Sequence, residues 1–127
     1  MWYPDAEHVE ISEFVGKTVV KIEGAVQDSE LKFYMDDGYV YTMYHCQDCC
    51  ESVYLEDISG DINDLIGKKI RIAESVSHEN PYASESGTWT FYKLFTDNWR
   101  DDTIVIRWNG ESNGYYSESV DIRKETY

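Results

Sequence analysis

Alternating apolar and polar positions mark the clearest strand of the chain. Leu31, Phe33 and Met35 alternate with more polar neighbours, which is the period of a strand with one buried face. Asp36, Asp37 and Gly38 follow and predict a tight turn, because Asp-Gly readily supplies the positive φ that such a turn needs. We expect the returning strand over residues 39–45.

The same reasoning predicts further strands over residues 18–23, 53–58, 89–95, 103–108 and 115–122. Two of the predicted hairpins are long: one holds the cysteine tract between 39–45 and 53–58, and the other joins 103–108 to 115–122. Residues 75–87, rich in Ser, Glu and Asn, predict a mobile loop, and the first ten residues predict a loose arm.

A short motif occurs twice. Residues 62–70 match residues 11–19 position by position, displaced by 51 residues (62 − 11), as cap, acid, two apolar residues, glycine and lysine. In the first copy Ser12 predicts a helix cap, Phe14 and Val15 predict inward positions, and Gly16 predicts the end of a helical turn. Phe91-Tyr92 further echoes Phe33-Tyr34, which indicates an internal duplication.

These elements predict a mainly β fold with a minor helical part. We expect one domain over residues 1–127, with pseudo-repeats at about 11–60 and 62–122. The architecture expected is a twisted antiparallel two-layer sheet, or a small barrel, of about eight strands with two short helical turns.

Charge is the strongest property of the composition. The chain has 25 Asp and Glu against 11 Lys and Arg, a net charge of -14, and no Lys or Arg lies between residues 33 and 67. Direct binding of nucleic acid is not expected, because a polyanion binds through cationic groups. A basic protein surface would be attracted, although acidity can also serve solubility alone.

The expected partner-binding residues follow from that charge and from the eleven tyrosines. Exposed aromatic residues beside acids suit a protein interface, although cross-strand aromatic packing is the plainer explanation for most of them. The residues predicted to bind a partner are Asp36, Asp37, Glu56, Asp57, Asp61, Asp64, Tyr115 and Tyr116.

All three cysteines lie in one tract. A structural or ligand-binding role is predicted for His45, Gln47, Asp48, Cys49, Cys50 and Glu51. Cys46 and Cys49 have the spacing of a zinc half-site, but a second pair is lacking, so no metal is expected. A cysteine nucleophile activated by His45 is a second interpretation. The third, which we favour, makes Cys49 and Cys50 small buried residues with free thiols, as in a reducing compartment.

The tract from His45 to Tyr54, the turn at 64–67, residues 88–92, and residues 106–108 with 112–117 resemble a family of small, uncharacterised phage and prophage proteins. The tract reads His-x-Gln-Asp-Cys-Cys-Glu, with Cys46 at its unspecified position. The resemblance implies no reaction, cofactor or catalytic residue. It implies a context in which small acidic proteins block host defence by occupying basic nucleic-acid-binding surfaces.

The sequence therefore predicts a non-enzymatic, anti-CRISPR-like inhibitor that binds a basic host protein. No signal peptide or membrane span is found, so we expect the host cytoplasm, and a homodimer is left open. The alternative is a small-ligand or metal-binding module that sequesters a nucleotide signal. An anionic ligand of that kind would require Lys68, Lys69, Arg71 or Arg107 to converge.

Overall fold

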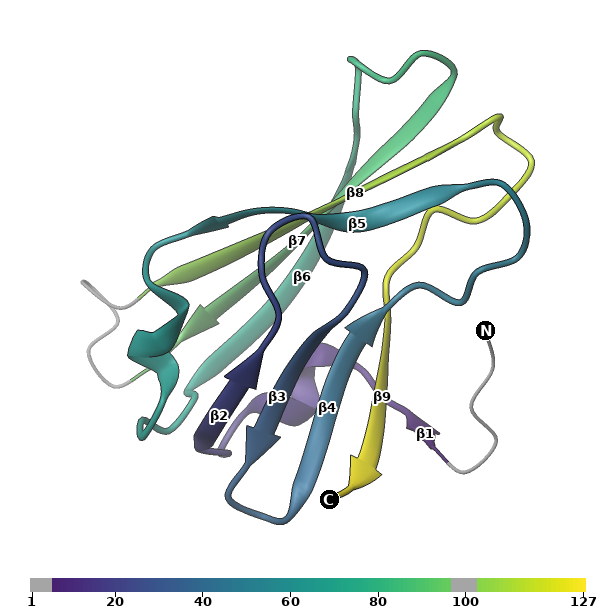
Figure 1. The fold of residues 1–127 in the computed structure, drawn as a ribbon. Helices are drawn as coiled ribbons and strands as arrows, with labels where there is room; N and C mark the ends of the chain where they lie inside the picture. Colours follow the sequence, from purple (N-terminus) through teal and green to yellow (C-terminus); the bar gives the residue numbers. More distant parts are fainter. Residues whose placement is uncertain (1–5, 97–102) are drawn as a thin grey trace.

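The fold, taken from a computed structural model, consists of two antiparallel β-sheets with two short 3-10 helices (Figure 1). The structure describes residues 6–96 and 103–127. Its elements in chain order are β1 (Glu7–His8), η1 (Ile11–Phe14), β2 (Val19–Glu23), β3 (Leu31–Met35), β4 (Tyr39–Tyr44), β5 (Ser52–Ser59), η2 (Ile62–Leu65), β6 (Ile72–Glu79), β7 (Ser86–Phe95), β8 (Ile104–Ser112) and β9 (Asp121–Thr126).

Each sheet is built around a meander of three consecutive strands. The first sheet has the order β1-β9-β4-β3-β2, and the second has the order β5-β8-β7-β6. The predicted two-layer antiparallel architecture is confirmed, and the sheets do not close into the alternative barrel.

The two long hairpins predicted from sequence are wrong, because their strands lie in different sheets. β4 pairs with β9 in the first sheet, and β5 pairs with β8 in the second. The chain crosses between the sheets twice, once through residues 45–51 after β4 and once through residues 113–120 after β8. Each half of the chain thus gives its last strand to the sheet formed by the other half.

The repeated motif forms matching contacts where the two halves meet. The Gly16 N–H donates to the Ile70 carbonyl at 2.8 Å, and the Gly67 N–H donates to the Val19 carbonyl at 2.8 Å. These two bonds are related by the 51-residue displacement of the sequence motif. The two copies occupy equivalent positions in the fold, while a duplication in the history of the chain stays a prediction.

The two 3-10 helices close the core from equivalent places. Phe14 ends η1 and Leu65 ends η2, and both side chains are fully buried. Val15, predicted to point inward, is 48% exposed, because the chain turns extended directly after the helix. Ser12 lies inside η1, so its predicted capping role is also wrong.

The strand repeat is less regular than the helical one. Phe33 is buried in β3, but in β7 the buried residue is Tyr92, whereas Phe91 is only partly covered. The predicted match of Phe91-Tyr92 to Phe33-Tyr34 is therefore displaced by one position, which places the two motifs on opposite faces.

The expected mobile loop at 75–87 is mostly hairpin. β6 extends to Glu79 and β7 begins at Ser86, and the two strands pair along their length. The segment is rich in serine and glutamate, as loops are, but most of its residues belong to two hydrogen-bonded strands. The N-terminal segment, also expected to be loose, pairs with β9 through β1, and residues 1–5 lie outside the described part.

The inner face of this hairpin changes from apolar to polar. Ala73 and Leu94 face each other within the hydrophobic core. Further along, Ser75 lies opposite Tyr92 and Ser77 lies opposite Thr90. The sheets therefore share an apolar core at one end of the hairpin and a hydroxyl-rich space at the other. In the described chain we find no helix with the length and apolar character that crossing a membrane demands.

Candidate functional site

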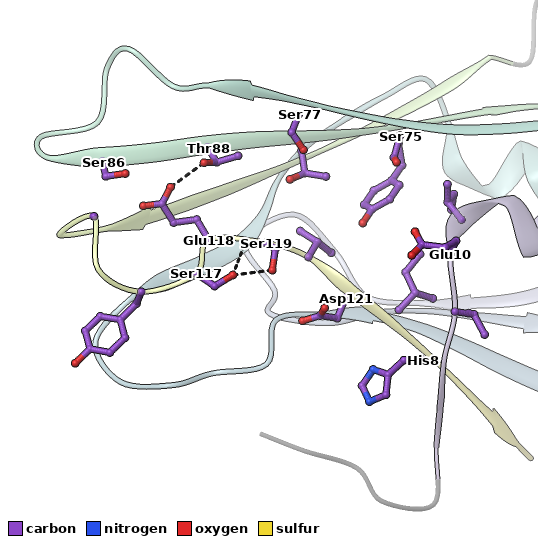
Figure 2. A pocket seen from close by; sticks show the side chains of 18 residues that line it. His8, Glu10, Ser75, Ser77, Ser86, Thr88, Ser117, Glu118, Ser119 and Asp121 are labelled. Atoms are coloured by element: carbon purple, nitrogen blue, oxygen red, sulfur yellow. Dashed lines mark hydrogen bonds between the residues drawn. The ribbon is translucent and has the colours of Figure 1, made fainter.

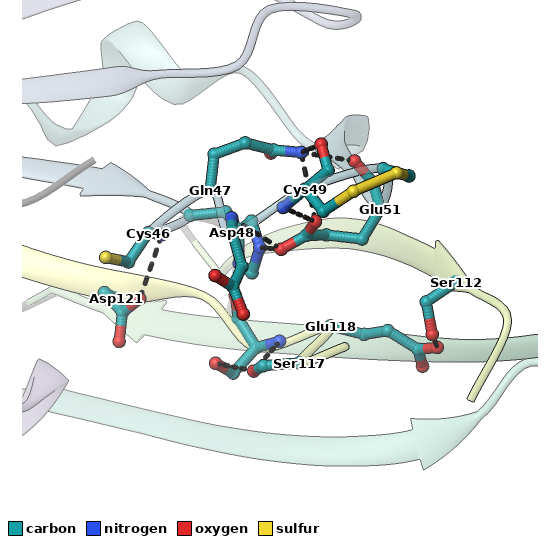
Figure 3. A network of polar contacts seen from close by, with 12 residues as sticks. Cys46, Gln47, Asp48, Cys49, Glu51, Ser112, Ser117, Glu118 and Asp121 are labelled. Carbon is teal, nitrogen blue, oxygen red and sulfur yellow. Dashed lines mark hydrogen bonds and ion pairs between the residues drawn. A yellow bond between two sulfur atoms is a disulfide. The ribbon is translucent and has the colours of Figure 1, made fainter. Parts of the chain in front are cut away.

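Glu51 organises the cysteine tract in the first crossover. Its side chain is buried, and its two carboxylate oxygens accept hydrogen bonds from four donors. The donors are His45 Nε2 at 2.7 Å, the Asp48 N–H at 2.9 Å, the Cys49 N–H at 2.8 Å and Gln47 Nε2 at 3.2 Å (Figure 3). The His45 hydrogen bond, helped by the backbone N–H groups, lowers the pKa of Glu51 to about 2 against the effect of its burial.

His45 joins this carboxylate to the second crossover. Its Nδ1 lies 2.6 Å from the Ser119 carbonyl oxygen, and its Nε2 lies 2.7 Å from Glu51. Each ring nitrogen thus lies within hydrogen-bond distance of an oxygen atom, one from each crossover. The buried His45 ring therefore bridges the two crossovers and fixes one against the other.

The cysteines do not match the interpretation that we favoured. Cys49 and Cys50 are exposed rather than buried, and they form a disulfide between adjacent residues, shown by the yellow bond in Figure 3. The expectation of free thiols is wrong for these two residues, while Cys46 is exposed and lies outside the disulfide. The two cysteines are exposed because the Glu51 side chain occupies the interior of the turn.

The two chemical alternatives for the tract find no geometry to support them. Both nitrogens of His45 are engaged by oxygen acceptors, so the ring is not directed at a thiol. Within residues 6–96 and 103–127 there is no group of three or more His, Cys, Asp or Glu side chains placed to hold a metal ion.

The tract instead supports a cavity wall. Besides the bond from His45 to Ser119, the Cys46 N–H donates to Asp121 Oδ2 at 3.2 Å. The second crossover also lies close to β8, since a Cβ on Gly110 would come 2.6 Å from the Glu118 carbonyl oxygen. Glycine permits this approach, so residues 117–121 are held from both sides.

The cavity has a volume of about 560 Å³ and lies between the β6–β7 hairpin, the second crossover and the segment from β1 to η1 (Figure 2). Serine and threonine hydroxyls line it from both the hairpin and the crossover. Its acids are Glu10, Glu118 and Asp121, and none of its described lining residues is Lys or Arg.

Glu118 is held within the cavity wall. It accepts hydrogen bonds from Thr88 Oγ1 at 2.8 Å and from Ser112 Oγ. Burial acts against its ionisation, but these hydroxyl donors keep its pKa below the ordinary value. Glu118 is thus an ionised structural acid.

Tyr92 lies at the apolar end of the cavity, and its side chain is only 4% exposed. Burial raises the pKa of its hydroxyl well above the usual value, and the charges of Asp121 and Glu10 raise it further. The hydroxyl is therefore neutral and lies in the field of two carboxylates.

The predicted partner-binding acids lie in separate places. Asp36 and Asp37 form the β3–β4 turn, at the lower end of Figure 1. Asp37 pairs with Lys17 at 2.7 Å. Burial acts to raise the pKa of Asp37, but the hydrogen bonds from Lys17 and from the Tyr39 N–H lower it below its ordinary value. Asp36 Oδ1 accepts from the Thr18 N–H at 3.4 Å.

The acids of β5 and η2 differ in their roles. Glu56 accepts from Arg107 Nε at 2.7 Å and from Trp89 Nε1 at 3.1 Å. Asp61 caps η2 by accepting from the Asn63 N–H. Asp57 and Asp64 are exposed.

Tyr115 and Tyr116 lie in the second crossover, away from these acids. Tyr115 is 83% exposed, and its ring packs edge-on against Tyr116 with centroids 5.1 Å apart. Tyr116 lines the large cavity and also a smaller one of about 340 Å³ beside Cys50. The predicted partner-binding residues therefore do not form one surface.

Sequence reasoning missed the residues that surround the large cavity, among them Glu10, Tyr92, Glu118 and Asp121. They come from segments that are distant in the chain, and the strand exchange brings them together. The only available indication was the run of serines and threonines on alternate positions of the hairpin.

The fold and site define a two-sheet β protein in which each half of the chain contributes one strand to the other half's sheet, with a polar cavity that is lined by acids. Residues 12–122 match the family described as a domain of unknown function, DUF7448, and the protein belongs to that family. This confirms membership of an uncharacterised family, while a phage origin stays a prediction. No curated protein and no solved structure matches the chain significantly.

Proposed function

We propose that this protein is a non-enzymatic counter-defence inhibitor of phage type, which binds and blocks a basic nucleic-acid-binding surface of a host defence protein. The observation that carries the proposal is the net charge of -14 together with the absence of Lys and Arg from residues 33–67. A surface of this sign attracts a basic groove and accelerates association with it. The site of action is the host cytoplasm.

The placement of the acids refines this proposal. Asp37 and Glu56 have cationic partners within the protein, so their charge is largely neutralised locally. Three exposed acids follow one another here: Asp57 lies in β5, Asp61 is the N-cap of η2 and Asp64 lies in η2. Asp36 is also exposed, but it lies at the β3–β4 turn beside the Lys17–Asp37 pair. The edge of the second sheet groups three exposed acids that have no ion pair among the described residues, and it is the proposed contact region.

The test is a pull-down from host-cell lysate with the immobilised protein, washed at low and at high salt. A basic nucleic-acid-binding protein should be retained at low salt and released at high salt, because exposed charges are screened. The purified partner should then lose nucleic-acid binding when the inhibitor is added. Retention that does not change with salt would contradict a charge-driven contact.

A second candidate is the small-ligand-binding module, and the 560 Å³ cavity favours it. Its volume lies within the range of small-molecule sites. Lys68, Lys69, Arg71 and Arg107 do not line the cavity, so its described lining does not offer the cationic groups expected for a nucleotide.

A further inference from the structure

The cavity between the β6–β7 hairpin and the second crossover is lined by a tyrosine hydroxyl that no other described residue hydrogen-bonds. Tyr92 is 4% exposed and lines the cavity, and its hydroxyl has no hydrogen-bond partner among the described residues. Buried polar groups are nearly always hydrogen-bonded. The partner of this hydroxyl therefore comes from the cavity, as water or as a ligand that displaces water.

The charge of the lining decides the class of that molecule. Glu118 is already occupied by Thr88 and Ser112, but Asp121 receives only the Cys46 N–H at one oxygen, and Glu10 lies exposed at the rim. No described lining residue carries a Lys or Arg charge. His8 also lines the cavity, and its Nδ1 lies 3.4 Å from the Tyr44 hydroxyl. The other ionisable side chains at neutral pH are carboxylates, so the field of the cavity favours a cation over an anion.

The pattern of donors and acceptors narrows the class further. A primary ammonium group has three donors and no acceptor. Asp121, Glu10 and the Tyr92 hydroxyl oxygen supply acceptors, while Val9, Ile11 and Ile122 supply apolar wall for a short alkyl chain. Charge-assisted hydrogen bonds of this kind are the strong ones.

We propose that the cavity binds an alkylammonium group, held by Asp121, Glu10 and the Tyr92 hydroxyl. The inference rests on the second candidate function and specifies its ligand. A free polyamine and a lysine side chain of another protein present the same chemistry, and the test separates these two sources.

The experiment is calorimetric titration of the full chain with spermidine, with an acetylated and amidated lysine, with a neutral disaccharide and with AMP. Spermidine or the lysine derivative should bind, and its affinity should fall as the salt concentration rises. The one that binds more tightly indicates whether the natural ligand is a free polyamine or a lysine side chain of another protein. Tyr92→Phe and the pair Glu10→Gln with Asp121→Asn should each lower the affinity by about tenfold, as expected for losing a hydrogen bond to a charged group.

The control pair is Glu74→Gln with Asp64→Asn. It removes the same number of negative charges from residues that do not line the cavity. It should change the affinity less than the cavity pair does. Equal losses in both pairs would overturn the site, because binding would then follow net charge alone. Tighter binding of the disaccharide or AMP would overturn the ammonium class but keep the ligand module, and no binding at all would overturn both. Tyr92→Phe keeps its ring in the core, so it tests the proposal even where the double variant fails to fold.

None of these titration results tests the inhibitor proposal. The salt-sensitive pull-down tests a different surface of the molecule, which carries Asp57, Asp61 and Asp64. A protein that binds no amine but still retains a basic partner would separate the two proposals.

Discussion

Glu51 determines the local structure of the tract more than the cysteines do. A buried carboxylate is costly unless it is paired and hydrogen-bonded, and this one has four donors from residues 45–49. Removing its charge weakens the contact with His45 and the bonds from the backbone N–H groups of Asp48 and Cys49. Glu51 is therefore the residue at which a small chemical change should have the largest local effect.

Glu51→Gln should lower stability at neutral pH and remove part of its acid dependence. The pKa of Glu51 is about 2 in the folded protein, below its ordinary value of 4.5. The unfolded chain therefore binds more protons between these values, so the contribution of Glu51 is complete above pH 4.5 and is lost as the pH falls towards 2. Melting temperatures of both proteins from pH 2 to 7 should differ most at neutral pH and converge at low pH. Parallel curves would contradict the lowered pKa of Glu51.

The disulfide gives a prediction of thiol number. Protein purified without reductant should react with iodoacetamide at one cysteine, Cys46, because Cys49 and Cys50 are joined. After reduction in denaturant, all three should react, and intact mass spectrometry counts the adducts directly. Three adducts on the unreduced native protein would show that the adjacent cysteines are free thiols.

These residue types could be recognised in the sequence, but their arrangement could not. His45, Asp48 and Glu51 are close in sequence, and a structural or ligand-binding role was predicted for the tract that contains them. Which member turns inward depends on the Ser119 carbonyl, and this group lies 74 positions away from His45. No local pattern encodes that contact.

At the scale of elements, the strands follow from periodicity and their pairing does not. Leu31, Phe33 and Met35 gave β3 with its correct buried face, and the turn at 36–38 gave the β3–β4 hairpin. The partner of β4 is β9, which lies at the far end of the chain. Both crossovers were mistaken for hairpin turns, because a polar, turn-rich segment looks the same in either setting.

The repeat can be tested through Phe14 and Leu65, which end the two 3-10 helices and are fully buried. Replacing either with Ala should cost about 2 to 5 kcal/mol of unfolding free energy, through lost burial and a cavity. Denaturant melts of the two variants provide the measurement.

The controls are the next residues, Val15→Ala and Ile66→Ala, at side chains that are 48% and 40% exposed. These should change the unfolding free energy by only about 0.5 kcal/mol. A neutral effect of one buried substitution beside a large effect of the other would show that the two positions are not equivalent in the core.

At the scale of the whole molecule, the cavity was beyond local sequence reasoning. Its wall combines residues from the N-terminal segment, the β6–β7 hairpin and the second crossover. Serine and threonine at alternate positions showed only that one strand face is polar. That this face is turned inward depends on the other sheet, and the strand exchange determines that placement.

The acidic charge of the molecule was evident from composition, but its distribution was not. Lys17 and Arg107 lie far in sequence from Asp37 and Glu56, and they pair with them in the fold. The Asp57, Asp61 and Asp64 set is the better test of a charge-driven interface. Replacing Asp61 would also alter the cap of η2, since its side chain accepts from Asn63. Asp57 and Asp64 are therefore the clean pair.

Asp57→Asn with Asp64→Asn should slow association with the basic host protein that the pull-down retains, and should flatten its dependence on ionic strength. Charges at the rim of an interface act mainly through steering at low salt. The fold should be kept, because both side chains are exposed and relief of repulsion does not weaken a strongly acidic protein. Association rates measured by surface plasmon resonance across a salt series give the result. Glu10→Gln with Asp121→Asn is the matched control, since it removes two charges from the cavity instead. If both pairs slow association equally, net charge alone drives the encounter and β5 and η2 are not the contact region. If neither pair slows it, the acidity of the chain serves solubility, and the inhibitor proposal loses its basis.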